Sequence, residues 1–144
     1  MDSKAETVYT VDDYYDGPRS GIADFGGRPH FYRSLYLENE KWDPDEDRFE
    51  LSPVSAEVRD LAVEAFLLWQ RWQVASFAGT AAPRNTGDVA VLPEDRARYF
   101  ELEAALAPFL VINPVTRFVM RGEFTGQSPR DQPLNGLTVR WTPV

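Results

Sequence analysis

The stretch that decides the fold is residues 55–77, with the sequence SAEVRDLAVEAFLLWQRWQVASF. Its apolar side chains recur at spacings of three and four, which is the pattern of an amphipathic helix. Ser55 is a favourable N-cap, and Gly79 follows the last apolar turn. The sequence predicts a long central helix that is buried on more than one side, because its apolar face is wide and comprises Val58, Leu61, Ala62, Ala65, Phe66, Leu68, Trp69 and Trp72. We expect its core contacts to come from Leu61, Ala65, Leu68 and Trp72.

Extended segments precede this helix. The clearest is a hairpin with strands at 22–25 and 28–36, joined by Gly26 and Gly27. A Gly-Gly pair supplies the positive φ angles that tight hairpin turns need. The composition also predicts short strands at 8–11 and 49–51, because both are rich in β-branched or aromatic residues.

A shorter helix and further strands follow. Pro93 is favourable at a first helical position, and Glu94 and Asp95 suit the positive end of the helix dipole, so we expect a helix over 93–107. Within it, Glu94 and Arg98 have the spacing of an i, i+4 ion pair. Alternating apolar residues predict strands at 117–124 and 137–141, and the apolar run 109–112 predicts another.

This order of elements indicates an α+β fold. We expect a small antiparallel sheet, built from the N-terminal hairpin and the C-terminal strands, packed on the long central helix and the shorter second helix. A chain of 144 residues predicts a single domain over 1–144. Residues 1–7 are expected to be frayed, and 80–91 and 125–136 are expected to be loops.

Charge and cysteine content exclude several classes of function. The formal net charge is -8, and the chain has no cysteine. Residues 1–50 hold 13 acidic and 6 basic residues, so the front of the chain is strongly acidic. This distribution disfavours binding to nucleic acid. No apolar run approaches the length of a membrane span, and no apolar signal segment stands at the start. We therefore expect a cytoplasmic protein that does not bind membranes.

No catalytic or metal-binding motif stands out, and no motif of a characterised family occurs. His30, the only histidine, follows Pro29, and Asp24 on the facing strand has the position to orient it. The alternative is a histidine half-covered in a sheet, which we favour. The acidic run 43–47 has Arg48 where a calcium loop needs glycine, and Val54 where it needs a glutamate. We expect no metal, no cofactor and no catalytic residues.

The remaining signal is a set of aromatic and acidic residues near the front of the chain. Tyrosine and tryptophan suit recognition surfaces because they bury much area for little side-chain entropy. The sequence therefore predicts a non-catalytic interaction protein, of an inhibitor, immunity or adaptor type, with a protein partner that is basic. Its contact residues would be Tyr14, Tyr15, Trp42, Asp43, Asp45, Glu46 and Asp47. The alternative is a small-molecule-binding protein or enzyme with a pocket near Asp24, His30 and Tyr32. The sequence does not indicate an oligomeric state.

Overall fold

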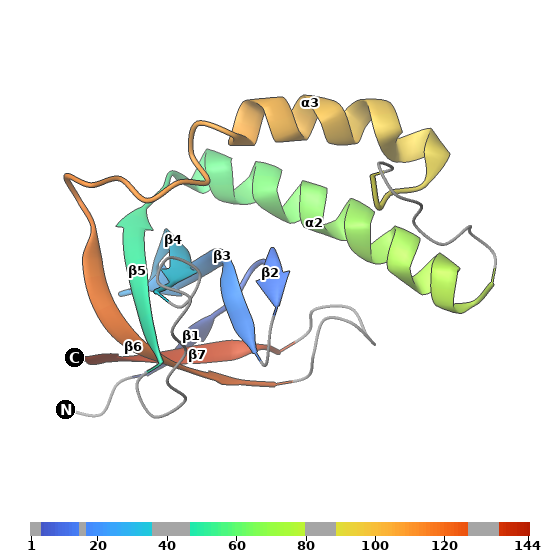
Figure 1. The fold of residues 1–144 in the computed structure, drawn as a ribbon. Helices are drawn as coiled ribbons and strands as arrows, with labels where there is room; N and C mark the ends of the chain where they lie inside the picture. Colours follow the sequence, from blue (N-terminus) through green and yellow to red (C-terminus); the bar gives the residue numbers. More distant parts are fainter. Residues whose placement is uncertain (1–3, 15–16, 36–46, 80–88, 127–135) are drawn as a thin grey trace.

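A computed structural model describes residues 4–14, 17–35, 47–79, 89–126 and 136–144 (Figure 1). Within these ranges the chain forms a seven-stranded antiparallel sheet and two α-helices, so the predicted α+β fold is confirmed. The strands are β1 (Ala5–Thr7), β2 (Asp13–Tyr14), β3 (Pro18–Phe25), β4 (Arg28–Ser34), β5 (Arg48–Pro53), β6 (Phe118–Thr125) and β7 (Thr138–Pro143). The helices are α2 (Ala56–Phe77) and α3 (Arg96–Leu106), and a 3-10 turn, η1 (Pro93–Asp95), leads into α3.

The sheet curls until the N-terminal segment joins its two edges. The strand order is β1-β7-β6-β5-β4-β3-β2, so the two outermost strands, β1 and β2, follow each other in the chain. Between them, the amide of Val8 donates to the carbonyl of Leu137 beside β7, at 3.2 Å. The amides of Tyr9 and Thr10 both donate to the carbonyl of Ile22 on β3, at 2.8 and 3.1 Å. The sheet is therefore closed like a barrel, and this segment is its seam.

Aromatic rings from four successive strands fill the inside of the curl. The ring centroids of Tyr32 on β4 and Trp141 on β7 are 6.1 Å apart. In a flat sheet, strands three places apart would be separated by roughly 14 Å. Phe49 and Phe124 lie between the two rings and contact both. Gly122 makes room for this cluster, because a Cβ there would lie 2.6 Å from Cζ3 of Trp141.

The helices cover the outer face of the sheet in two layers, with α2 against the strands and α3 outside α2 (Figure 1). Side chains alternate between the two faces of a strand, so Ile22 and Phe31 point outward where their neighbours Ala23 and Tyr32 point inward. The two outward residues, Ile22 and Phe31, pack in one cluster with two residues of each helix: Val58 and Ala62 of α2, and Leu102 and Leu106 of α3.

The most buried residues of α2 belong to the predicted apolar face but lie about a quarter turn from the four predicted core contacts. Its buried apolar residues are Val58, Ala62 and Phe66, whereas the predicted set is only half-buried: Leu61, Ala65, Leu68 and Trp72. In the structure, Leu61, Ala65 and Leu68 pack at the margin of the cluster that includes Leu102 and Leu106 of α3. The helix itself, with Ser55 accepting a hydrogen bond from the Val58 amide at 3.1 Å, is confirmed.

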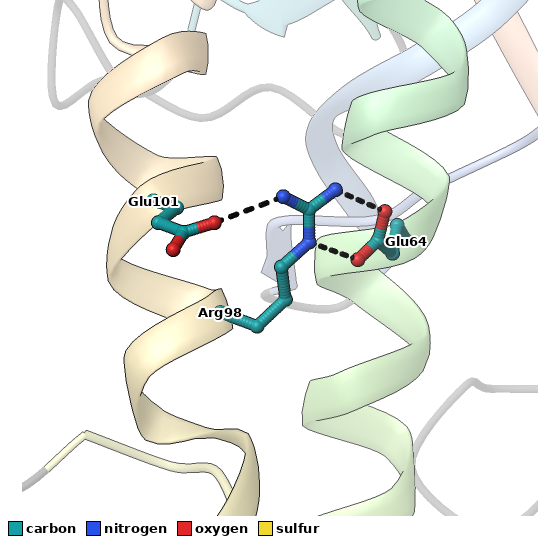
Figure 2. A network of polar contacts seen from close by, with 3 residues as sticks. All are labelled: Glu64, Arg98 and Glu101. Atoms are coloured by element: carbon teal, nitrogen blue, oxygen red, sulfur yellow. Dashed lines mark hydrogen bonds and ion pairs between the residues drawn. The ribbon is translucent and has the colours of Figure 1, made fainter.

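Exposed ion pairs connect the two helices (Figure 2). Arg98 of α3 donates to both carboxylate oxygens of Glu64 on α2 and to Glu101 in its own helix. The neighbouring guanidinium lowers the pKa of Glu64. The predicted pair of Glu94 with Arg98 is wrong, because Glu94 lies near Arg71 of α2 instead, at 3.6 Å. Tertiary contacts between helices therefore replaced the local one.

Two other expectations about the strands are also corrected. Residues 5–7 are not frayed, because β1 pairs with β7 in the register Ala5 to Arg140. Residues 109–112 do not form a strand; they continue from α3 as turns and bends. The apolar side chains in this segment contact the helix cluster through Leu110 and Ile112, so their hydrophobicity reflects packing and not a sheet.

Candidate functional site

The three residues of the predicted pocket do not meet in one cavity. His30 pairs with Ala23 across the hairpin, and Asp24 pairs with Pro29, so His30 and Asp24 point to opposite faces of the sheet. Asp24 accepts a hydrogen bond from the hydroxyl of Tyr9 at 2.9 Å. Asp24 is therefore not placed to orient His30 as a general base.

His30 and Tyr32 are both packed inside the curl. The ring of His30 contacts Phe25 and Phe118 edge-on, at centroid distances of 5.5 and 5.6 Å, and its Nδ1 donates to the Arg28 carbonyl. Tyr32 is fully buried, and its hydroxyl donates to the carbonyl of Thr10 at 3.0 Å. Burial raises the pKa of this tyrosine. The surroundings of His30 and Tyr32 are therefore those of residues that stabilise the core.

Most of the predicted partner-binding residues lie outside the described residues: Tyr15, Trp42, Asp43, Asp45 and Glu46. Tyr14, on β2 at the margin of the sheet, is 44% exposed. Asp47 accepts from Arg19 at 2.7 Å, and Arg19 is only 1% exposed. Because Asp47 neutralises a buried cation, its carboxylate has a structural role, and it is not a free surface charge.

An open groove of about 1090 Å³ lies between the outer face of the sheet and the helices. Its apolar walls come from α2, α3 and the segment that follows α3, and they include Ala65, Phe66, Trp69, Leu106, Leu110 and Ile112. This volume is close to the upper end of the range for pockets that bind small organic molecules, about 300–1,000 Å³.

A row of polar side chains crosses the floor of the groove. Asp13 on β2 pairs in register with Ser20 on β3, Ser20 with Arg33 on β4, and Arg33 with Glu50 on β5. Directly paired residues of antiparallel strands share a face, so all four lie on the outer side. The next row along these strands is Ile22, Phe31 and Ser52, which the helices cover. The polar row that forms the floor therefore lies next to a largely apolar row, which packs against the helices.

The acidic residues at both ends of this row have hydrogen-bond partners. Glu50 is 7% exposed, and its Oε1 accepts from Nε and a terminal nitrogen of Arg117 at 2.9 and 2.7 Å. Ser20 donates to Asp13 at 2.8 Å. Arg33 lies between these pairs, half-buried, and forms no ion pair with any residue in the described ranges. Arg33 is therefore a cation on the floor of the groove that can bind an anionic group.

Asp12 lies at the β2 end of the groove and behaves differently from an ordinary surface carboxylate. Its backbone amide donates to the carbonyl of Ser20 at 2.8 Å. Desolvation, and then the adjacent charge of Asp13, raise the pKa of Asp12 to about 7. The residue keeps exposed surface on the groove side, so water reaches it and moderates this effect.

Chemically, the groove can hold a molecule with an apolar body and one anionic group. The walls would bury the body, and Arg33 would bind the anion with charge-assisted hydrogen bonds. Asp13 is two strands from Arg33, roughly 10 Å away, which is too far for an ion pair. Glu50 is neutralised by Arg117, so it does not pair with Arg33 either. Within the described ranges, no three histidine or acidic side chains come together as metal ligands.

Sequence reasoning did not identify this groove. Arg33 and Glu50 sit in segments predicted to be strands, but the alignment of four strands that places them in one row depends on register. The one available signal was the alternation at Phe31, Tyr32 and Arg33, which puts an arginine on the same face as a large apolar residue.

Comparisons with known proteins add no further assignment. In the part of the chain that the structure describes, no helix is long and apolar enough to cross a lipid bilayer. Neither a protein-family model, nor a curated protein sequence, nor a solved structure matches this chain.

Proposed function

We propose that this protein is a non-enzymatic binder of small amphipathic anions, with the anionic group at Arg33 and the apolar body between the sheet and the helices. The observation that carries this proposal is Arg33 itself: a half-buried cation without an ion pair in the described ranges, on the floor of a groove with apolar walls. It corresponds to the small-molecule alternative from the sequence, with the site moved from His30 to the outer face of the sheet.

The geometry gives each part of such a ligand a counterpart. An apolar chain in the groove gains roughly 25 cal/mol for each Å² of apolar surface removed from water. A hydrogen bond to a charged group adds roughly 1.5–3 kcal/mol when the site is shielded. Phe66 and Trp69 would contact the chain, because both line the groove from α2.

Octanoate tests this proposal, with 1-octanol and octylammonium as probes of equal chain length. Titration followed by heteronuclear NMR should show octanoate binding with shifts at Phe31, Arg33 and Ala65. Arg33→Gln should weaken octanoate binding by roughly 10–100-fold, which corresponds to the loss of one charge-assisted contact. The weaker binding of 1-octanol should not change in this variant.

Arg28→Gln is the matched control, because Arg28 is an exposed arginine on the same strand and does not line the groove. It should bind octanoate as the wild type does. The proposal is wrong if Arg33→Gln binds octanoate with wild-type affinity, or if octylammonium binds as tightly as octanoate.

We also propose the protein-partner function as a second candidate, because Tyr14 is 44% exposed on the marginal strand β2. Five acidic residues and Lys41 would accompany it, since residues 36–46 have a net charge of -4 from Glu38, Glu40, Asp43, Asp45, Glu46 and Lys41. Affinity capture would identify the partner first. Neutralising Asp43, Asp45 and Glu46 should then slow association and reduce its dependence on salt. Asp47 is left unchanged, because replacing it would remove its ion pair with the buried Arg19. Wild-type association by the triple variant would exclude this function.

A further inference from the structure

We infer that Arg117 is a positioning residue for anion binding: by occupying Glu50, it keeps Arg33 free to bind the ligand. This inference rests on the proposed function, since it concerns the same groove. It assigns a task to a residue that does not itself contact the anion.

The register of β4 and β5 shows why Arg33 would pair with Glu50 if Arg117 did not. Arg33 and Glu50 are directly opposite each other on β4 and β5 and point to the same face. Opposite charges at such positions attract each other, because their Cβ atoms lie roughly 5 Å apart. Glu50 is buried, so without a partner its carboxylate would be strongly driven to find one. Arg33 would be the nearest cation on the neighbouring strand.

The observed pairing is different. Two donors of Arg117 converge on Oε1 of Glu50, at 2.9 and 2.7 Å, although Arg117 is 67 positions away in the chain. Arg117 is partly exposed, at 41%, so it can satisfy Glu50 from the solvent side while Arg33 stays in the groove. The floor thus holds two arginines and one glutamate, and the more exposed arginine takes the glutamate.

The origin of Arg117 connects this arrangement to the wall of the groove. Arg117 immediately precedes β6 and follows the segment 107–114, which supplies Leu110, Val111 and Ile112 to the wall. The same segment is attached to β5, because the Asn113 amide donates to the Ser52 hydroxyl at 3.3 Å. One connection therefore places both the apolar wall and the cation that neutralises Glu50.

Three variants test the inference with octanoate as the probe. In Arg117→Gln, Glu50 should turn to Arg33, and octanoate affinity should fall by about as much as in Arg33→Gln, roughly 10-fold or more. In the double variant Glu50→Gln with Arg117→Gln, Arg33 has no competing carboxylate, so affinity should return to within roughly threefold of wild type. Arg121→Gln is the matched control, because Arg121 is an exposed arginine on β6, four residues after Arg117, and this variant should bind normally.

The rescue separates a positioning role from a merely structural one, because a variant that simply disturbed the fold would not recover when a second contact is removed. NMR of the arginine Nε–H groups gives an independent readout: the Arg33 signal should become protected from exchange in Arg117→Gln. If Arg117→Gln binds octanoate normally while Arg33→Gln does not, this inference is wrong and the proposed function stands. If the double variant binds as poorly as Arg117→Gln, the inference is also wrong. If Arg33→Gln binds normally, the proposed function itself fails.

Discussion

Replacing Gly122 with alanine tests the closed, aromatic-filled interior on which the outer groove is built. The new Cβ would lie 2.6 Å from Cζ3 of Trp141 and 3.0 Å from Cδ1 of Phe49. Carbon atoms in good contact are about 3.5–4.0 Å apart, so the indole must withdraw by about 1 Å. Phe49 is fully buried and Trp141 almost so, and Trp141 is also held by its Nε1 hydrogen bond to the Asp24 carbonyl at 2.9 Å.

The magnitude follows from two opposing effects. Overpacking a core costs about 1–3 kcal/mol, whereas replacing glycine with alanine stabilises by about 0.4–1 kcal/mol through the unfolded chain. The net loss in unfolding free energy should therefore be about 1–2 kcal/mol, and for a domain of this size the Tm should fall by about 4–8 °C. Urea titration gives the first quantity, and thermal unfolding followed by near-ultraviolet circular dichroism gives the second.

A second background shows whether the cost comes from the predicted overlap. Phenylalanine has no atom in place of the indole Cζ3, so Gly122→Ala should cost about 1 kcal/mol less when Trp141 is already Phe. If the alanine variant is as stable as the wild type, or costs the same in both backgrounds, the rings do not converge on Gly122 and the sheet is not curled as described.

Two further predictions concern α2 and the groove. Phe66→Ala should cost about 3–5 kcal/mol in urea titration, whereas Leu68→Ala should cost only about 1–2 kcal/mol because it is half-buried; the reverse order would restore the face predicted from the sequence. The fold raises the pKa of Asp12 from 3.8 to about 7, so the folded state holds this proton more tightly than the unfolded chain, and stability is lost as the pH rises between these values. Asp12→Asn should therefore gain about 1 kcal/mol over wild type between pH 4.5 and pH 8, a value reduced for the exposure of the residue; urea midpoints that change in parallel with pH would contradict this.

Local signals predicted the elements well, and long-range register decided the rest. Ser55 and Gly79 bracket α2, and the pair Gly26-Gly27 joins β3 to β4. By contrast, β1 was predicted to be frayed because its sequence, Ala-Glu-Thr, has no apolar pattern. Its pairing with β7 joins residues more than 130 positions apart, and no local pattern carries that information.

The same limit explains why the site was missed. Arg19 and Arg33 lie on the adjacent strands β3 and β4. Arg19 is 1% exposed and paired with Asp47, whereas Arg33 is half-buried and has no ion pair in the described ranges. Which arginine is structural depends on acids that are distant in the chain: Asp47 pairs with Arg19, whereas Glu50, opposite Arg33, pairs with Arg117 instead.

The groove is open because covering the charged residues of the polar row with a helix would cost free energy. Burying charged groups away from water costs several kcal/mol for each ion, even when they are paired. The helices can therefore seal the row of Ile22, Phe31 and Ser52, but covering Arg33 in the same way would leave an unpaired charge without water. An open groove over the polar row avoids that cost, because water reaches the guanidinium in the absence of a ligand. A ligand that displaces this water must itself supply a negative charge, so the feature that keeps the groove open also selects what can fill it.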